Sequence, residues 1–163
     1  MKIASIGCLA FLSDYITKRL AEARLPLNGD LKVLPGGKMA LQRINNEGTA
    51  GGYFGGRRLV KVMAAGMAFL SFVQSLIYKW RKDNIFLRLG STLVLAGGLG
   101  NLNDRLTRGH VTDFLRFKVG KNFTRLVYNV ADLFIFLGAF FVALGELVKK
   151  IHELRRTDMK RDD

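Results

Sequence analysis

The segment that most constrains the fold is a nearly uninterrupted apolar run near the C-terminus. It reads LFIFLGAFFVALG at residues 133–145 and presents no polar face at any helical phase. A helix of this kind is buried on all sides, in a protein core or in lipid. Three further apolar runs lie at residues 3–13, 62–78 and 89–102. A chain of 163 residues forms one domain at most and can hardly bury four such helices completely, so we predict a membrane protein.

The distribution of charge supports a membrane protein. The chain has 26 Lys and Arg against 13 Asp and Glu, a formal charge of +13, which is typical of a nucleic-acid binder or of a membrane protein with basic loops. The basic residues lie between the apolar runs rather than on one element, so we expect no nucleic-acid partner. Because a spanning helix needs ~20 residues, the spans are long enough only if Asp14, Arg88 and Asp132 lie inside helices. Ionisable residues at that depth are functional candidates.

These observations predict an all-α integral membrane protein of a single domain. Its four transmembrane helices are expected at about residues 3–20, 60–78, 85–104 and 127–149. Four spans place both termini on one side, and the basic loop at 79–83 and the basic tail at 150–163 indicate that this side is cytoplasmic. The connections at about 21–59 and 105–126 are then extracytoplasmic.

The two extracytoplasmic connections carry strand signals. The first contains LKVL and KMALQRI between turn-forming residues, a pattern typical of short strands. In the second, Leu115, Phe117 and Val119 alternate with Arg116 and Lys118, which is the period of a half-exposed strand. We expect a small β element to cover the outer ends of the helices.

Polar side chains collect where the third apolar run ends. Asn101 and Arg105 are four residues apart, so a continuing helix presents them on one face. Asp113 follows within HVTDF, and the fourth helix begins with YNVADLF, where Asn129 and Asp132 are three residues apart. If the third and fourth helices pack side by side, the two carboxylates can meet. Two close carboxylates cannot both ionise, so one keeps a proton while the other acts as a base. The pattern is compatible with a peptide hydrolase that works without metal.

Other readings of these residues stay open. Asp113 can cap a turn, and Asp132 can be a charge that is stabilised at a helix N-terminus. His110 and Asp113 resemble half a metal site, but the only other histidine, His152, lies in the opposite tail, so we expect no metal. Too few residues precede the single cysteine, Cys8, for a cleavable signal peptide, so we expect the first apolar run to stay as a helix.

The motifs resemble those of the bacterial lipoprotein signal peptidases, also called signal peptidase II. DYITK at 14–18 is similar to the family's Asp-Gln-x-Thr-Lys, and NEGTAGG from Asn46 resembles its Asn-x-Gly-Ala-Ala-Phe segment. GGLGNLNDRLTRGHVTDFLRF resembles the Gly-Asn-x-x-Asp-Arg and Val-x-Asp-Phe block, and YNVADLFI resembles the Phe-Asn-x-Ala-Asp block. The last two matches are specific, because order, spacing and position at helix ends all agree.

The resemblance implies a four-helix membrane aspartic protease with an extracytoplasmic β-cradle and with Asp113 and Asp132 as its catalytic pair. It implies that five residues bind the substrate, namely Asn46, Gly48, Asn101, Arg105 and Asn129. Asp14 and Lys18 are implied as supporting residues.

The implied substrate is a prolipoprotein whose cysteine carries diacylglycerol, cut on the N-terminal side of that cysteine. We expect a monomer without cofactor in the bacterial cytoplasmic membrane, in contact with membrane lipid and with its active site on the extracytoplasmic side. The chain departs from the family pattern at Tyr15, Thr49 and Gly51, where Gln, Ala and Phe are usual. These departures motivate one alternative, a non-catalytic paralogue that binds lipidated peptides without cleaving them.

Overall fold

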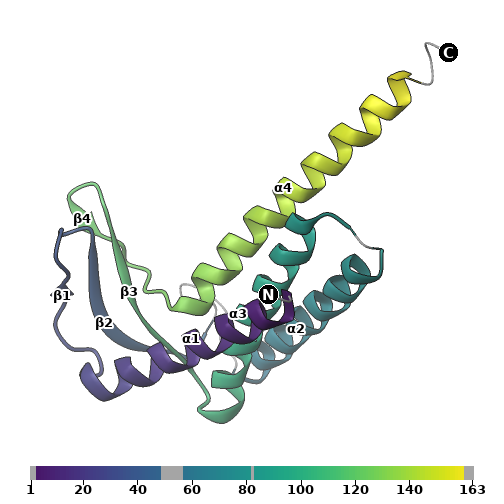
Figure 1. Cartoon of the computed structure of the whole chain (residues 1–163). Helices are drawn as coiled ribbons and strands as arrows, with labels where there is room; N and C mark the ends of the chain where they lie inside the picture. Colours follow the sequence, from purple (N-terminus) through teal and green to yellow (C-terminus); the bar gives the residue numbers. More distant parts are fainter. Residues whose placement is uncertain (1–2, 49–56, 82, 160–163) are drawn as a thin grey trace.

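The computed structural model describes residues 3–48, 57–81 and 83–159. Thr49 and Gly51 lie outside the described residues. Along the chain the elements are α1 (Ile3–Arg24), β1 (Lys32–Val33), β2 (Met39–Asn46), α2 (Arg57–Trp80), α3 (Ile85–Thr107), β3 (Val111–Val119), β4 (Asn122–Phe123) and α4 (Val130–Met159). Figure 1 shows the strands together beside the C-terminal end of α1 and the N-terminal end of α4, with the far end of α4 pointing away from them.

Helix α3 lies at the centre of the helical part and contacts α1, α2 and α4. Its contact with α4 is unusually close. A Cβ placed on Gly90 would lie 2.6 Å from the carbonyl oxygen of Gly138, and a Cβ placed on Gly138 would lie 2.6 Å from that of Gly90. Only glycine permits this approach of two backbones, which is the small-residue packing expected of helices in a bilayer.

The outer surfaces of the helices are apolar. Three helical segments are long and apolar enough to cross a membrane, at Arg58–Trp80, Ile85–Thr107 and Val130–Arg155. On α2, for example, Met67 and Leu70 expose 68% and 65% of their surface. Contiguous apolar surface of this extent is unusual in a soluble monomer. The prediction of a mostly helical, multi-pass membrane protein is therefore confirmed with three candidate spans, and α1 is not among them.

The strands form one antiparallel sheet in the order β1-β2-β3-β4. The sheet packs on the end of α1, where Phe114 and Leu115 join Ala21 and Leu25 in a buried cluster. The predicted small β element is confirmed.

Strand β3 starts earlier than the alternating pattern indicates. The alternation begins at Leu115, whereas β3 begins at Val111 and residues 111–115 are all buried. A strand that is covered on both faces loses the period of two that marks a half-exposed strand. This hidden part of the strand contains Asp113, which pairs in register with Ile44 of β2.

Candidate active site

Asp113 is held in the buried part of β3 by two amides. Its side chain is 2% exposed. Its Oδ1 accepts a hydrogen bond from Asn129 Nδ2 at 2.6 Å, and its Oδ2 accepts one from Asn46 Nδ2 at 2.9 Å. Burial raises the pKa of Asp113 from 3.8 to about 6, although these two hydrogen bonds oppose the change. The carboxyl group therefore holds a proton at a pH where an exposed aspartate has lost it.

Asp132 lies in the first turn of α4 and forms a reciprocal cap with the residue that precedes the helix. Its backbone N–H donates to Asn129 Oδ1 at 3.0 Å, and its Oδ2 accepts from the backbone N–H of Asn129 at 3.1 Å. This is the arrangement of a capping box. The other oxygen, Oδ1, accepts from Asn101 Nδ2 at 2.9 Å. The sequence left two roles open for Asp132, a charge at a helix N-terminus and a member of a carboxylate pair. The two roles are compatible, because capping occupies only one of its oxygens.

Asn129 connects the two aspartates. Its buried side-chain amide donates both to Asp113 Oδ1 and, at 3.1 Å, to Asn101 Oδ1. Its backbone N–H donates to Asp132 Oδ2, and its side-chain oxygen accepts the backbone N–H of Asp132. Asp132 is close enough that its charge raises the pKa of Asp113 further. The structure thus brings two carboxylates from different elements together around one asparagine.

Lys18 supports this group from α1. Its Nζ lies 2.9 Å from Asn101 Oδ1, 2.8 Å from Asp14 Oδ2 and 2.9 Å from Asp104 Oδ2. Lys18 and Asp14 are each 1% exposed. A buried charge is tolerated when it is paired and hydrogen-bonded, and Lys18 meets both conditions. It therefore fixes Asn101, which in turn contacts Asp132.

Asp14 joins α1 to the start of α4. Its Oδ1 accepts the backbone N–H of Ala131 at 2.8 Å, which satisfies one of the free N–H groups at the helix N-terminus. A Cβ placed on Gly100 would lie 2.5 Å from Asp14 Oδ2. The glycine in GGLGN therefore makes room for this carboxylate between the helices.

Arg105 links α3 to the segment that follows β2. Its Nη2 donates to the carbonyl oxygen of Gly48 at 3.1 Å, and its Nη1 donates to that of Asn101 at 3.2 Å. The N–H of Gly48 donates to Asn46 Oδ1 at 3.1 Å, which leaves the amide nitrogen of Asn46 for Asp113. All five residues expected to bind substrate thus lie in one connected network with the two aspartates.

A second charged cluster, which we did not predict, lies behind Asp113. Glu22 Oε1 accepts from Arg108 Nη1 at 2.5 Å and from Thr112 Oγ1 at 2.7 Å. Thr112 is fully buried and is the neighbour of Asp113 in β3. The cluster therefore ties the strand that carries Asp113 to α1.

A weak signal for this cluster is present in the sequence. Asp14, Lys18 and Glu22 follow one another at intervals of four residues, which places them on one helical face. The contact of Glu22 with Thr112 has no such signal, because it joins residues far apart in the chain. Within the described ranges, no group of three or more His, Cys, Asp or Glu side chains could hold a metal ion.

Comparison with known proteins identifies the family. The family described as Signal peptidase (SPase) II matches residues 6–148. A protein named lipoprotein signal peptidase from Sinorhizobium fredii is 35% identical over 157 residues, which cover 95% of this chain and 93% of that protein. Another of the same name from Brucella ovis is 34% identical over 140 residues, or 86% of each chain.

The fold is also similar to that of solved structures. Two structures described as bacterial membrane enzymes superpose with TM-scores of 0.75 and 0.72, at 22% and 23% sequence identity. The first match covers 91% of this chain and 88% of the other, and the second covers 89% and 92%. Taken with the sequence matches along almost the whole chain, these similarities show that the chain belongs to the signal peptidase II family of aspartic peptidases.

Proposed function

We propose that this chain removes the signal peptide from diacylglyceryl-modified prolipoproteins, with Asp113 and Asp132 as its catalytic pair. Cleavage of lipoprotein signal peptides is the activity that the family and its named relatives support. The observation that carries the assignment of the pair is the position of Asn129, whose side-chain amide donates to the Asp113 carboxylate and whose backbone N–H donates to the Asp132 carboxylate.

The geometry supports acid–base hydrolysis by the pair. Asp113, whose pKa is raised to about 6, donates its proton to the carbonyl oxygen of the scissile amide. Asp132 takes a proton from water, and the water oxygen attacks the carbonyl carbon. The tetrahedral intermediate collapses when Asp132 returns that proton to the amide nitrogen and the carbonyl oxygen returns its proton to Asp113. The amide bond breaks, and the pair regains its starting state.

We propose that α1 is a fourth membrane span. Its 22 residues extend about 33 Å, enough to cross a hydrocarbon core of about 30 Å. Asp14 and Lys18 lower its hydropathy, but both are buried and paired inside the protein. The side that faces outward carries exposed Leu9, Leu12, Ile16 and Leu20.

Four spans place the sheet and the two aspartates on the extracytoplasmic side. The basic α2–α3 connection and the basic end of α4 then lie in the cytoplasm of a bacterial cell, in agreement with the positive-inside rule. A single copy of the chain contributes both aspartates, so a monomer is sufficient for the reaction.

The lipid of the substrate fits a site at the membrane surface. Apolar side chains are exposed near the two aspartates on α3 and α4: Leu106, Leu133 and Phe136. These offer the diacylglyceryl chains an apolar surface while the peptide enters the polar network. The amide on the N-terminal side of the lipidated cysteine is then the bond next to the pair. The comparisons give no support to a non-catalytic paralogue.

The test is cleavage of one prolipoprotein in two forms, with and without diacylglycerol on its cysteine. The purified protein is incubated with each in detergent, and mass spectrometry locates the cut. We expect a single cut immediately before the lipidated cysteine and none in the unlipidated form. Binding of the lipidated form without cleavage, while the protein is folded, would instead indicate the paralogue. A cut at another bond would contradict the proposed substrate position.

A further inference from the structure

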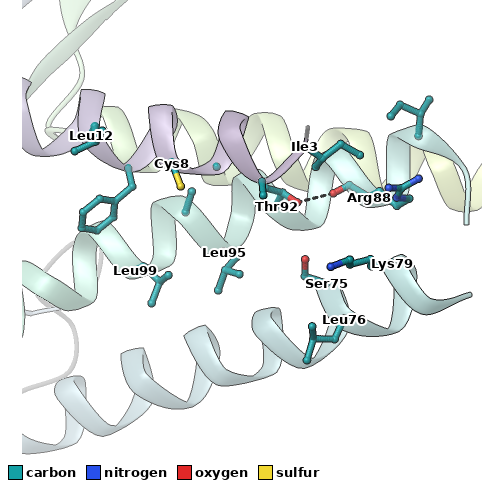
Figure 2. Close-up of a pocket in the computed structure, with 15 residues that line it drawn as sticks. Ile3, Cys8, Leu12, Ser75, Leu76, Lys79, Arg88, Thr92, Leu95 and Leu99 are labelled. Carbon is teal, nitrogen blue, oxygen red and sulfur yellow. Dashed lines mark hydrogen bonds between the residues drawn. The ribbon is translucent and has the colours of Figure 1, made fainter. Parts of the chain in front are cut away.

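A long apolar groove lies between α1, α2 and α3. It has a volume of about 1070 Å³, slightly above the usual range of ligand pockets, about 300–1,000 Å³. Figure 2 shows Cys8 and Leu12 of α1 on one side, Leu76 of α2 on the other, and Leu95 and Leu99 of α3 between them. Its apolar lining suits hydrocarbon chains.

One end of the groove is cationic. Lys79 from α2 and Arg88 from α3 lie there together, beside the hydroxyl of Ser75 (Figure 2). Within the part of the chain that the structure describes, neither cation forms a salt bridge; the nearby Asp83 pairs instead with Lys149 at 3.7 Å. Two cations next to an apolar groove are complementary to an anionic headgroup with acyl chains, and basic pockets between membrane helices bind such lipids.

The cationic end of the groove is distinct from the catalytic site. Arg88 and Asn101 lie thirteen positions apart on α3, a separation of about 20 Å along a helix. The cationic end therefore lies near the opposite end of the helix from the aspartates. The signal peptide of a substrate is a poor occupant of this end, because the positively charged segment at its start would meet Lys79 and Arg88.

We propose that this groove binds one anionic phospholipid, with its phosphate on Lys79 and Arg88 and its acyl chains along α1 and α3. The proposal rests on the membrane topology given above, which places the cationic end at the cytoplasmic surface. The lipid is a stable component of the protein rather than its substrate.

The first test compares lipid headgroups. The protein is purified in a mild detergent, stripped of lipid and titrated with phosphatidylglycerol or phosphatidylcholine of identical acyl chains, and bound lipid is counted by native mass spectrometry. We expect one phosphatidylglycerol to bind at least tenfold more tightly than phosphatidylcholine. The double variant Lys79→Ala/Arg88→Ala should lower its affinity by roughly fivefold per cation. Arg81→Ala, an exposed residue of the same connection that does not line the groove, should change it little.

The second test fills the groove. Cys8 is exposed and lines the groove, whereas its neighbour Leu9 is 56% exposed and does not. Cys8→Trp should lower phosphatidylglycerol binding at least tenfold, and Leu9→Trp should leave it unchanged. Circular dichroism of both variants checks that they are folded.

Three results would overturn the proposal. An equal loss of phosphatidylglycerol affinity in Arg81→Ala and in the double variant would indicate that the basic surface as a whole attracts the lipid. Full binding in Cys8→Trp would place the lipid outside the groove. Displacement of phosphatidylglycerol by a lipidated prolipoprotein would assign the groove to the substrate. Peptide cleavage is measured on the same samples, so a failure of the proposed activity is seen separately from a failure of lipid binding.

Discussion

Replacing Asp113 by asparagine should make the protein's stability less dependent on pH. Burial raises the pKa of Asp113 from 3.8 to about 6. A group whose pKa is raised on folding favours the folded state at low pH, and that stability is lost as the pH rises from 3.8 to about 6. Asparagine carries no charge at any pH and has nearly the same shape. The variant therefore lacks this source of pH dependence.

The size of the effect follows from the change in pKa. A tenfold change in an equilibrium is worth about 1.4 kcal/mol, so the ionised carboxyl disfavours the folded state by about 3 kcal/mol above pH 6. About 1.4 kcal/mol of this develops between pH 5 and pH 8. Asparagine at this position also destabilises the folded state. Asn46 and Asn129 both donate to the Asp113 side chain, and in the variant one of these two donors must face the new amide nitrogen. A buried group left without a partner costs about 1–3 kcal/mol, so the variant at pH 8 should match or modestly exceed the parent in stability.

Thermal unfolding in detergent measures the effect. Between pH 5 and pH 8 the midpoint of the parent protein should fall by about 3–6 °C more than that of Asp113→Asn, given about 2–4 °C per kcal/mol for a chain of this size. The exposed carboxylate of Asp30 provides the control, since Asp30→Asn should behave like the parent. If the unfolding midpoints of Asp113→Asn and of the parent changed equally with pH, the reasoning that Asp113 is buried with a raised pKa would be refuted.

Three further predictions concern the packing and the network. Gly90→Leu should destabilise the protein by about 1–3 kcal/mol or more, because the leucine side chain would collide with the α4 backbone. Gly66→Leu should not destabilise it, because a Cβ at this position meets nothing within 4 Å. Equal melting midpoints of the two variants would contradict the close contact of α3 and α4. Asn129→Ser should keep the helix cap and hence the stability to within about 1 kcal/mol, yet it should lower cleavage at least about a hundredfold, because serine lacks the amide that donates to Asp113 and Asn101. Near-parental cleavage would show that this side-chain amide is dispensable. Glu22→Gln should lower kcat more than it raises KM, since Glu22 positions the strand of Asp113 through Thr112. Adding Thr112→Val to this variant should lower kcat little further. A change in KM alone would argue against this role.

Much of the site could be predicted from the sequence. Asn129 and Asp132 are three residues apart at the start of an apolar run, and this short spacing survives in the structure as a reciprocal cap. Asn101 and Arg105 likewise share a helical face whatever the rest of the fold does. The family resemblance then indicated Asp113, which spacing alone left between a capping role and a catalytic one.

The remaining features depend on tertiary contacts. The early start of β3 is hidden because residues 111–115 are buried on both faces and so show no alternation. The hydrogen bond of Glu22 with Thr112 joins residues 90 positions apart, and no local pattern specifies it. The apolar groove depends on how α1 and α2 are spaced around α3, which the hydrophobic runs do not determine.

The most direct test of the catalytic pair is the rate of cleavage at a single turnover. Asp113→Asn, Asp132→Asn and the exposed control Asp30→Asn are each mixed in excess with a diacylglyceryl-modified prolipoprotein, and the appearance of the free signal peptide is followed. We predict that each of the first two variants binds the substrate but cleaves it about 10²–10⁴-fold more slowly than the parent. Asp30→Asn should cleave at the parental rate. Cleavage close to the parental rate by either dyad variant would contradict the account.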